Sequence, residues 1–380
     1  MSHRPGRPQR VLLVAGTRPE AIKLAPLVRR LRSEPDQFDP VLCATAQHRE
    51  MLDQVLRVFD LKPDVDLDLM RPDQSPNEVA SRVLAALDPL LARIEPDWLI
   101  VQGDTTTAMA SALAAFHRRV RIGHVEAGLR TGDLCRPFPE EANRRVVDLV
   151  SSAYFAPTQR AARALVAEGA PETTVHTTGN TIVDALLEIA RRQGDEPETD
   201  SVLVTVHRRE SFGPPLEGVL RAVERLARAF PRTRFLHVVH PNPNVLAAVR
   251  RNQGPPNLDL LEPLDYPGLV RLLRQSRLVL TDSGGIQEEA PTFGKPVLVL
   301  REKTERPEAV EAGRALLVGT DEERIVAEAS RLLSDPAARR RMAEGPNPYG
   351  DGRAADRIAH ALAGRSYSPF APAAPAAANT

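Results

Sequence analysis

Short apolar runs alternate with longer segments of helical periodicity through most of the chain. A short apolar run bounded by turn residues is typical of a buried strand, whereas apolar residues spaced three and four apart indicate an amphipathic helix. On this basis we predict a first series of strands at 10–16, 41–44, 65–69, 98–102, 121–125 and 154–156. A second series follows at 202–205, 234–239, 258–261, 278–281, 296–300 and 315–317. Helices are predicted between the strands, including 21–31, 77–94, 107–116, 216–230 and 322–333.

Strands that alternate with helices specify parallel, doubly wound sheets, and two such series in 380 residues predict two domains. We place one Rossmann-like domain at 1–178 and a second at 179–350, because the pattern changes near Thr178-Gly179-Asn180. The segment 351–365 is expected to form a helix that crosses back to the first domain. The tail at 366–380 is rich in Pro and Ala, and we expect it to be disordered.

The composition argues against several classes of function. The 50 basic and 50 acidic residues cancel, so nucleic acid or an anionic membrane surface is not expected as the main partner. Cys43 and Cys135 give neither a disulfide framework nor a metal-ligand spacing. No apolar stretch approaches the roughly 18 residues of a membrane span, and the apolar run after the basic N-terminus is too short for a signal peptide. We therefore expect a cytoplasmic protein.

A glycine turn between a predicted strand and a predicted helix is the first candidate site. In Ser283-Gly284-Gly285 the two glycines let the backbone approach a phosphate closely. Glu289 follows about one helical turn later, where a carboxylate can accept hydrogen bonds from a ribose diol. A tight turn with helix-starting acids is the alternative. The first predicted strand ends in a comparable turn, which places Arg18 and Lys23 near a helix N-terminus; solvated charges on a capped helix are the alternative there.

Three carboxylates follow predicted strands or begin a helix of the first domain. Asp104 and Glu126 both come directly after strands, at the carboxyl edge where ligands bind in open α/β folds. An N-cap for Asp104 and a loop ion pair with Arg130 for Glu126 are the alternatives. Glu140 begins a helix and lies four residues before Arg144, so the two form either a simple helix pair or part of a site. Crowded acids in a partly dry site suit acid and base chemistry.

The second domain contributes basic groups at strand ends. His207 and Arg208 follow the strand at 202–205, and His240 follows the strand at 234–239. Neither histidine has metal-ligand spacing. The charged segment 301–309 follows the strand at 296–300, which places it at the same sheet edge unless it is only a solvated loop.

Together these segments resemble the non-hydrolysing UDP-N-acetylglucosamine 2-epimerases over about residues 11–362. The motifs that carry the resemblance are Gly-Thr-Arg-Pro-Glu at 16–20, Gly-Asp-Thr-Thr-Thr at 103–107, His-Val-Glu-Ala-Gly-Leu-Arg-Thr-Gly-Asp at 124–133, Pro-Glu-Glu-Ala-Asn-Arg at 139–144, His-Arg-Arg-Glu-Ser-Phe-Gly at 207–213 and Asp-Ser-Gly-Gly-Ile-Gln-Glu-Glu-Ala at 282–290. The resemblance implies two Rossmann-like domains in the GT-B arrangement, with an active-site cleft between them, and a homodimer. It also implies a reaction that uses no NAD and no metal.

The family interconverts UDP-GlcNAc and UDP-ManNAc. Its members eliminate UDP across C1 and C2 of the sugar to give 2-acetamidoglucal, and add UDP back with the proton on the opposite face. Carried over, the catalytic residues are Asp104, Glu126, Glu140, Arg144 and His207. The UDP-binding residues are Arg18, Lys23, Arg208, His240, Tyr266, Ser283, Gly284, Gly285 and Glu289. The resemblance does not assign which acid removes the proton.

A regulatory site and two other functions also follow as expectations. Some bacterial members bind a second UDP-GlcNAc as an activator, and Gln47, His48 and Arg49 match that region. Glu50 and Asp73 depart from it with negative charges, which argues against activation. A hydrolysing epimerase that releases ManNAc and UDP, or a glycosyltransferase of the same fold, would use the same nucleotide site. A nucleotide-sugar sensor is disfavoured, because no carboxylate is missing.

Overall fold

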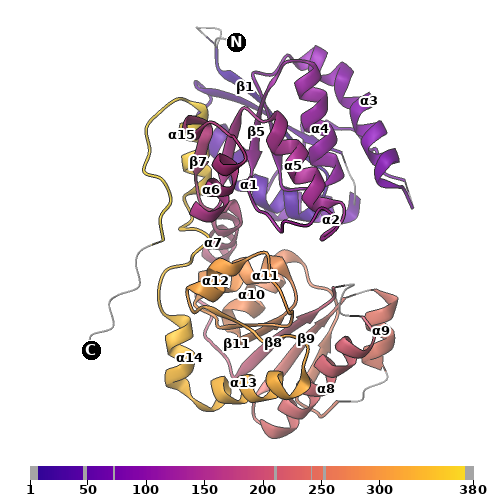
Figure 1. Ribbon diagram of the computed structural model, residues 1–380, viewed down its shortest axis with the longest axis vertical. Helices are drawn as coiled ribbons and strands as arrows, with labels where there is room; N and C mark the ends of the chain where they lie inside the picture. The colour runs from indigo at the N-terminus through magenta and orange to yellow at the C-terminus, as the bar shows by residue number, and fades with distance from the viewer. Residues whose placement is uncertain are drawn as a thin grey trace. The chain divides into compact units, whose positions relative to one another are not determined.

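The computed structural model describes residues 7–45, 49–71, 73–208, 212–240, 242–250 and 254–372. Within them the chain divides into two compact units (Figure 1). The N-terminal unit is built from Met1–Ala185 and Gly350–Ala371, and the C-terminal unit from Leu186–Tyr349. The division falls inside helix α7 (Thr181–Gln193), and helix α15 (Ala354–Leu362) belongs to the N-terminal unit.

The N-terminal unit contains a 7-stranded parallel sheet in the order β3-β2-β1-β4-β5-β6-β7. Its strands are β1 (Gln9–Ala15), β2 (Phe38–Ala44), β3 (Val65–Asp66), β4 (Trp98–Gln102), β5 (Arg121–Val125), β6 (Ala153–Ala156) and β7 (Val175–Thr177). Its other helices are α1 (Arg18–Arg32), α2 (Arg49–Val58), α3 (Pro76–Ile94), α4 (Thr106–His117), α5 (Glu140–Val150) and α6 (Gln159–Ala167). Helix α1 packs against α2 and α15, whereas α4 packs against α3 and α5.

The C-terminal unit contains a 6-stranded parallel sheet in the order β10-β9-β8-β11-β12-β13. Its strands are β8 (Ser201–Val206), β9 (Arg234–Val239), β10 (Leu258–Leu261), β11 (Leu278–Thr281), β12 (Val297–Val299) and β13 (Ala315–Leu317). Its helices are α8 (Pro214–Ala229), α9 (Pro243–Arg250), α10 (Tyr266–Gln275), α11 (Gly284–Glu289), α12 (Pro307–Glu311), α13 (Glu322–Ser334) and α14 (Pro336–Ala343). Helices α8 and α13 lie together on one face of this sheet (Figure 1).

Both sheets are parallel and doubly wound, as the alternation of strands and helices predicts. In each sheet the strand order reverses at one point, between β1 and β4 in the N-terminal unit and between β8 and β11 in the C-terminal unit. The connections that leave adjacent strands at such a point run to opposite faces, which opens a crevice beyond the carboxyl ends of the strands. Each unit therefore has one preferred position for a ligand.

Buried aliphatic side chains fill the space between each sheet and its helices, and they determine which face of each helix packs on the sheet. Leu12 and Val14 of β1 pack with Leu99 and Val101 of β4, beneath the alanine-rich face of α4. Helix α1 begins in a capping box: the Thr17 side chain accepts a hydrogen bond from Glu20 N, and the Glu20 carboxylate accepts one from Thr17 N. Capping and packing thus agree on where α1 and α4 begin, since Thr17 caps α1 and Thr105 caps α4. The loops before these two helices therefore have fixed positions.

The structure corrects the expected bounds at several places. Strand β3 ends at Asp66, because Asp68 has a φ of 46° and cannot continue an extended strand. Strand β7 was not predicted from the sequence. We expected the whole tail to be disordered, but its first residues are ordered. Phe370 is buried and donates its N–H to Thr177 O at 2.8 Å. Residues 373–380 lie outside the described part. No helix among the described residues is long and apolar enough to cross a membrane.

Candidate functional site

Glu20 joins the two loops at the switch point of the N-terminal unit. Its carboxylate accepts hydrogen bonds from Gly16 N and Thr17 N, each at 2.7 Å, and from Thr105 Oγ1 at 2.5 Å. The first two donors follow β1 and the third follows β4. Burial raises the pKa of Glu20, although its hydrogen bonds act in the opposite direction. Glu20 thereby fixes the turn that carries Arg18, which is half-buried there.

Glu126 lies at the end of β5 with a φ of 68°, and it is buried. Its Oε2 forms an ion pair with Lys23 Nζ of α1 and accepts from Gln102 Nε2 of β4 at 2.5 Å. The alternative that pairs Glu126 with Arg130 is wrong, because Arg130 instead bonds Asp148 and Glu168. Two of the residues predicted for the site, Lys23 and Glu126, are thus in direct contact.

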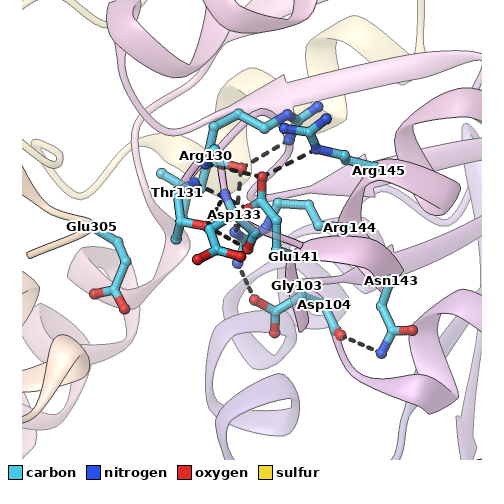
Figure 2. Close-up of polar contacts among 12 residues, drawn as sticks. Gly103, Asp104, Arg130, Thr131, Asp133, Glu141, Asn143, Arg144, Arg145 and Glu305 are labelled. Atoms are coloured by element: carbon cyan, nitrogen blue, oxygen red, sulfur yellow. Dashed lines mark hydrogen bonds and ion pairs between the residues drawn. The ribbon is translucent and has the colours of Figure 1, made fainter. Parts of the chain in front are cut away.

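Asp104 and Arg144 form a second ion pair at the same edge (Figure 2). Arg144 is buried on α5, and its Nη2 donates to Asp104 Oδ2. Asn143 donates from Nδ2 to the Asp104 carbonyl at 3.0 Å, so α5 holds both ends of this residue. The N-cap of α4 is Thr105, so the cap alternative for Asp104 is wrong.

The neighbouring glutamates at the start of α5 have different environments. Glu141 is fully buried and accepts from Thr131 N at 3.1 Å and from Arg145 Nε at 3.1 Å. Glu140 is half-buried, and its Oε2 has no hydrogen-bond partner in the described part of the chain. The helix-pair alternative for Glu140 and Arg144 is therefore wrong, because Arg144 bonds Asp104. Sequence reasoning singled out Glu140 and missed the loop-fixing role of Glu141.

A buried network lies under the turn that carries Asp104. The His124 ring of β5 is fully buried, with Nδ1 at 2.6 Å from Asp148 Oδ1 and Nε2 at 2.8 Å from Gly103 O. The other oxygen of Asp148 accepts from Arg130 Nη2 at 2.7 Å (Arg130 is labelled in Figure 2). Burial acts to raise the pKa of Asp148, but His124 and Arg130 reverse the shift and lower it. His124 was visible in the sequence only as part of a motif, and Asp148 was not singled out.

Asp282 holds the loops at the switch point of the C-terminal unit. This fully buried carboxylate follows β11 and accepts from His207 N at 2.9 Å and Arg208 N at 2.8 Å, both of which follow β8. The His207 and His240 rings lie 5.2 Å apart. Burial, and next the neighbouring His207, lower the pKa of His240. The predicted histidines therefore meet at one edge, and sequence reasoning missed Asp282, which holds the backbone of His207 and Arg208 there.

Arginines surround the glycine turn of the C-terminal unit. A Cβ atom on Gly284 would lie 3.3 Å from Arg208 Nη2 and 3.3 Å from Arg306 Nη1. Glu305 lies between these cations, with Arg301 Nη1 at 2.8 Å, Arg306 Nη1 at 3.7 Å and Arg208 Nη1 at 3.8 Å. Burial would raise the pKa of Glu305, but the arginines lower it to about 2. Arg301, Glu305 and Arg306 belong to the charged segment 301–309, whose place after a strand was their only sequence signal.

The other predicted binding residues fall into two groups. Ser283, Gly285 and Glu289 lie together, since a Cβ on Gly285 would be 3.8 Å from Ser283 Oγ and 4.0 Å from Glu289 Oε1. Tyr266 is buried at the first residue of α10, on a different element from the glycine turn. Gln47, His48 and the Arg49 side chain lie outside the described residues. Among the described residues, no group of three or more His, Cys, Asp or Glu side chains is arranged to hold a metal ion.

The comparisons with known proteins agree over nearly the whole chain. The family described as UDP-N-acetylglucosamine 2-epimerase matches residues 29–363. A relative of that name from Yersinia pestis is 48% identical over 369 residues, with 93% of this chain and 98% of the relative covered. A crystal structure of UDP-GlcNAc 2-epimerase from Neisseria meningitidis, bound to UDP-GlcNAc, has a TM-score of 0.87 at 41% identity and covers 93% of this chain and 99% of that one.

A more distant structure gives the same result. The UDP-GlcNAc 2-epimerase of Methanocaldococcus jannaschii, in complex with UDP-GlcNAc and UDP, has a TM-score of 0.81 at 31% identity and covers 93% of this chain and 99% of that one. The paired parallel sheets, the two switch-point clusters and these matches give one conclusion: the chain belongs to the UDP-N-acetylglucosamine 2-epimerase family.

Proposed function

We propose that this protein interconverts UDP-GlcNAc and UDP-ManNAc by elimination and re-addition of UDP, with the sugar bound to UDP in both the substrate and the product. The observation that carries the proposal is the set of carboxylates at one sheet edge of the N-terminal unit. Glu126 is paired there with Lys23, Asp104 is paired with Arg144, and Glu140 has an oxygen without a partner in the described part. The relatives named after this activity support the same reaction.

The chemistry explains why several carboxylates are needed. C2 of the sugar is not next to a carbonyl, so its proton is not acidic enough for simple removal and return. Loss of the C2 proton together with cleavage of the C1–O bond releases UDP and forms 2-acetamidoglucal. UDP oxygen then attacks C1 while a proton is delivered to the other face of C2. Acid and base groups must therefore act on two faces, and Asp104, Glu126 and Glu140 are the candidates.

Cations in the C-terminal unit suit the departing diphosphate. Arg208 and Arg306 flank Gly284, and His207 and His240 are held near one another by the loops at the same switch point. Donors aimed at charge that develops on a leaving group are each worth about 10²–10³ in rate. We assign Arg18, His240, Ser283, Gly284 and Gly285 to the diphosphate and Glu289 to the ribose. Arg208 and Tyr266 are assigned to the UDP site. We add Arg306 to the diphosphate group, because its guanidinium lies beside Gly284.

The remaining site residues have roles in the same proposal. His207 assists departure of the phosphate, and Arg18 and Lys23 belong to the UDP-sugar site. The protein acts as a homodimer in the cytoplasm and needs no NAD or metal. The non-hydrolysing reaction is proposed over the hydrolysing one, which would release ManNAc and UDP, and over transfer of the sugar to an acceptor.

Amide variants test the carboxylates. Asp104→Asn, Glu126→Gln and Glu140→Gln should each lower the rate of UDP-ManNAc formation by about 10²–10⁴, the range of general acid and base catalysis. Asp88→Asn, an exposed aspartate paired with Arg118, is the control and should keep the wild-type rate. NMR of the sugar anomeric signals follows the reaction. Undiminished activity in the three amide variants would remove these residues from the mechanism, and product formed only when an acceptor is added would favour a transferase.

A further inference from the structure

His124 has hydrogen-bond acceptors on both sides of its ring. Nε2 lies 2.8 Å from the Gly103 carbonyl oxygen, which can only accept, so this nitrogen donates. Nδ1 lies 2.6 Å from Asp148 Oδ1. If Asp148 is ionised, this nitrogen must donate as well, and the ring is then an imidazolium. The protonation of Asp148 therefore decides the charge of His124.

Asp148 is held in its ionised form. Burial acts to raise the pKa of Asp148, but the guanidinium of Arg130, whose Nη2 donates to its second oxygen at 2.7 Å, acts to lower it. Arg130 is in turn bonded to Glu168 at 2.7 Å. Tyr154 of β6 also faces this carboxylate, because burial, and next the charge of Asp148, raise the pKa of Tyr154. Asp148 thus lies between the Arg130 guanidinium and the His124 ring, which is fully buried.

The Gly103 carbonyl is part of the turn that delivers Asp104. Gly103 has a φ of 73°, a conformation that other residues rarely adopt, and its N–H donates to Val125 O at 3.0 Å. With His124 bonded to its carbonyl, both polar groups of Gly103 are held by β5. The next residue is Asp104, whose own carbonyl is held by Asn143. Glu126 follows His124 by two residues and comes directly after β5.

We infer that His124 is a positioning residue for the reaction: a buried imidazolium that, anchored by Asp148, holds the Gly103 carbonyl and so sets the place of Asp104. The inference rests on the proposed function, in which Asp104 is an acid–base group. His124 touches no substrate in this scheme. Its contribution is a fixed position of the catalytic carboxylate, and a small displacement of a reacting group lowers the rate by about 10².

The protonation is tested in wild-type protein without reference to activity. In a long-range ¹H–¹⁵N correlation spectrum of protein labelled at histidine, both His124 ring nitrogens should carry a proton at pH 7.5, and His124→Gln identifies the signals by their loss. A spectrum in which one of the two nitrogens is unprotonated overturns the inference. Because this readout needs no substrate, it holds or fails independently of the proposed epimerase activity.

A matched pair of variants tests the positioning. The Gln side-chain amide reaches the place of Nε2 and keeps a donor toward Gly103, whereas the Asn amide reaches the place of Nδ1 and loses it. His124→Asn should lower kcat about 100-fold at little change in KM, and His124→Gln should lower it by no more than about tenfold. Thermal unfolding establishes that both variants are folded. Equal losses in two folded variants, or a loss confined to KM, would contradict the role; inactive wild-type protein would instead remove the proposed function.

Discussion

The acidic side chains near the N-terminal switch point have two kinds of partner, backbone N–H groups and cationic side chains. Glu20 and Glu141 bond backbone N–H groups and fix loops. Glu126 and Asp104 are paired with the cations of Lys23 and Arg144. At the scale of single residues, Glu20 and Glu141 are therefore loop-fixing groups, whereas Glu126 and Asp104, which we propose as acid–base groups, each face a cation.

The buried pair of Lys23 and Glu126 gives the first prediction. Replacement of Lys23 by Met leaves the Glu126 carboxylate buried beside an apolar side chain, which should lower the free energy of unfolding by about 3 kcal/mol. Arg118→Met breaks an exposed pair with Asp88 and should change stability little. Urea unfolding of both variants at pH 7.5 measures the difference. Equal stability of the two variants would show that the pair is not held out of solvent.

The adjacent glutamates at the start of α5, Glu140 and Glu141, give the second prediction. Glu140→Gln should leave the free energy of unfolding within about 0.5 kcal/mol of wild type. Glu141→Gln should lower it by about 2 kcal/mol, because the amide cannot replace both charged acceptor oxygens facing Thr131 N and Arg145. Chemical unfolding read by circular dichroism gives both values. A larger loss of stability in the Glu140 variant would reverse the assignment of the two residues.

At the scale of elements, the sequence predicts what depends on periodicity and turn residues, and misses what depends on distant partners. The strands at 98–102 and 121–125 agree with β4 and β5, because buried apolar runs end in clear turn signals. Strand β7 is short and contains His176 between Val175 and Thr177, so it lacks an apolar run. The partners of Glu126 and His124 come from other elements, and no local pattern encodes them. The same limit hid Asp282, whose donors lie 74 and 75 residues away.

Helix α15 illustrates a cap supplied by another element, and it predicts a pH dependence. Its N-cap residue has no side-chain cap bond, and Asp184 of α7 instead accepts from Ala354 N at 3.2 Å and Ala355 N at 2.9 Å. Burial raises the pKa of Asp184 to about 7, well above the ordinary 3.8. The folded protein therefore binds a proton that the unfolded chain has lost between about pH 4 and pH 7. Stability contributed by this group is full below pH 4 and is lost as the pH rises through 7.

The variant Asp184→Asn isolates that contribution. The difference in free energy of unfolding between wild type and variant should shift against the wild type by about 3 kcal/mol from pH 5 to pH 8. Urea unfolding of both proteins at the two pH values provides the measurement, and groups that titrate alike in both cancel. A difference that stays constant over this range would show that Asp184 is ionised at pH 5 in the folded protein.

At the scale of the whole chain, the residues after α15 return to the N-terminal unit. The Tyr367 hydroxyl lies 2.6 Å from His176 Nδ1, and Arg357 donates from Nε to Ser368 O at 2.9 Å. Phe370 is buried, with the Arg357 guanidinium 5.8 Å from its ring centroid. Composition alone predicted disorder, because Pro and Ala outnumber the two aromatic side chains that bind this segment to β7 and α15.

Truncation of that anchor gives the fourth prediction. Phe370→Ala removes a buried ring and should lower the free energy of unfolding by about 3 kcal/mol. Leu149→Ala, at a side chain that is 83% exposed, should stay within about 0.5 kcal/mol. Thermal and urea unfolding report both changes. If the two variants match, residues 366–371 do not contribute to the stability of the N-terminal unit.

The most direct measurement incubates the purified protein with UDP-GlcNAc in D₂O and follows the anomeric and C2 signals by NMR. Elimination and re-addition predict UDP-ManNAc with deuterium at C2, deuterium at C2 of the recovered UDP-GlcNAc, and sugar that remains attached to UDP in both species at equilibrium. Retention of the original hydrogen at C2 of UDP-ManNAc, or accumulation of free ManNAc with UDP, would contradict the account.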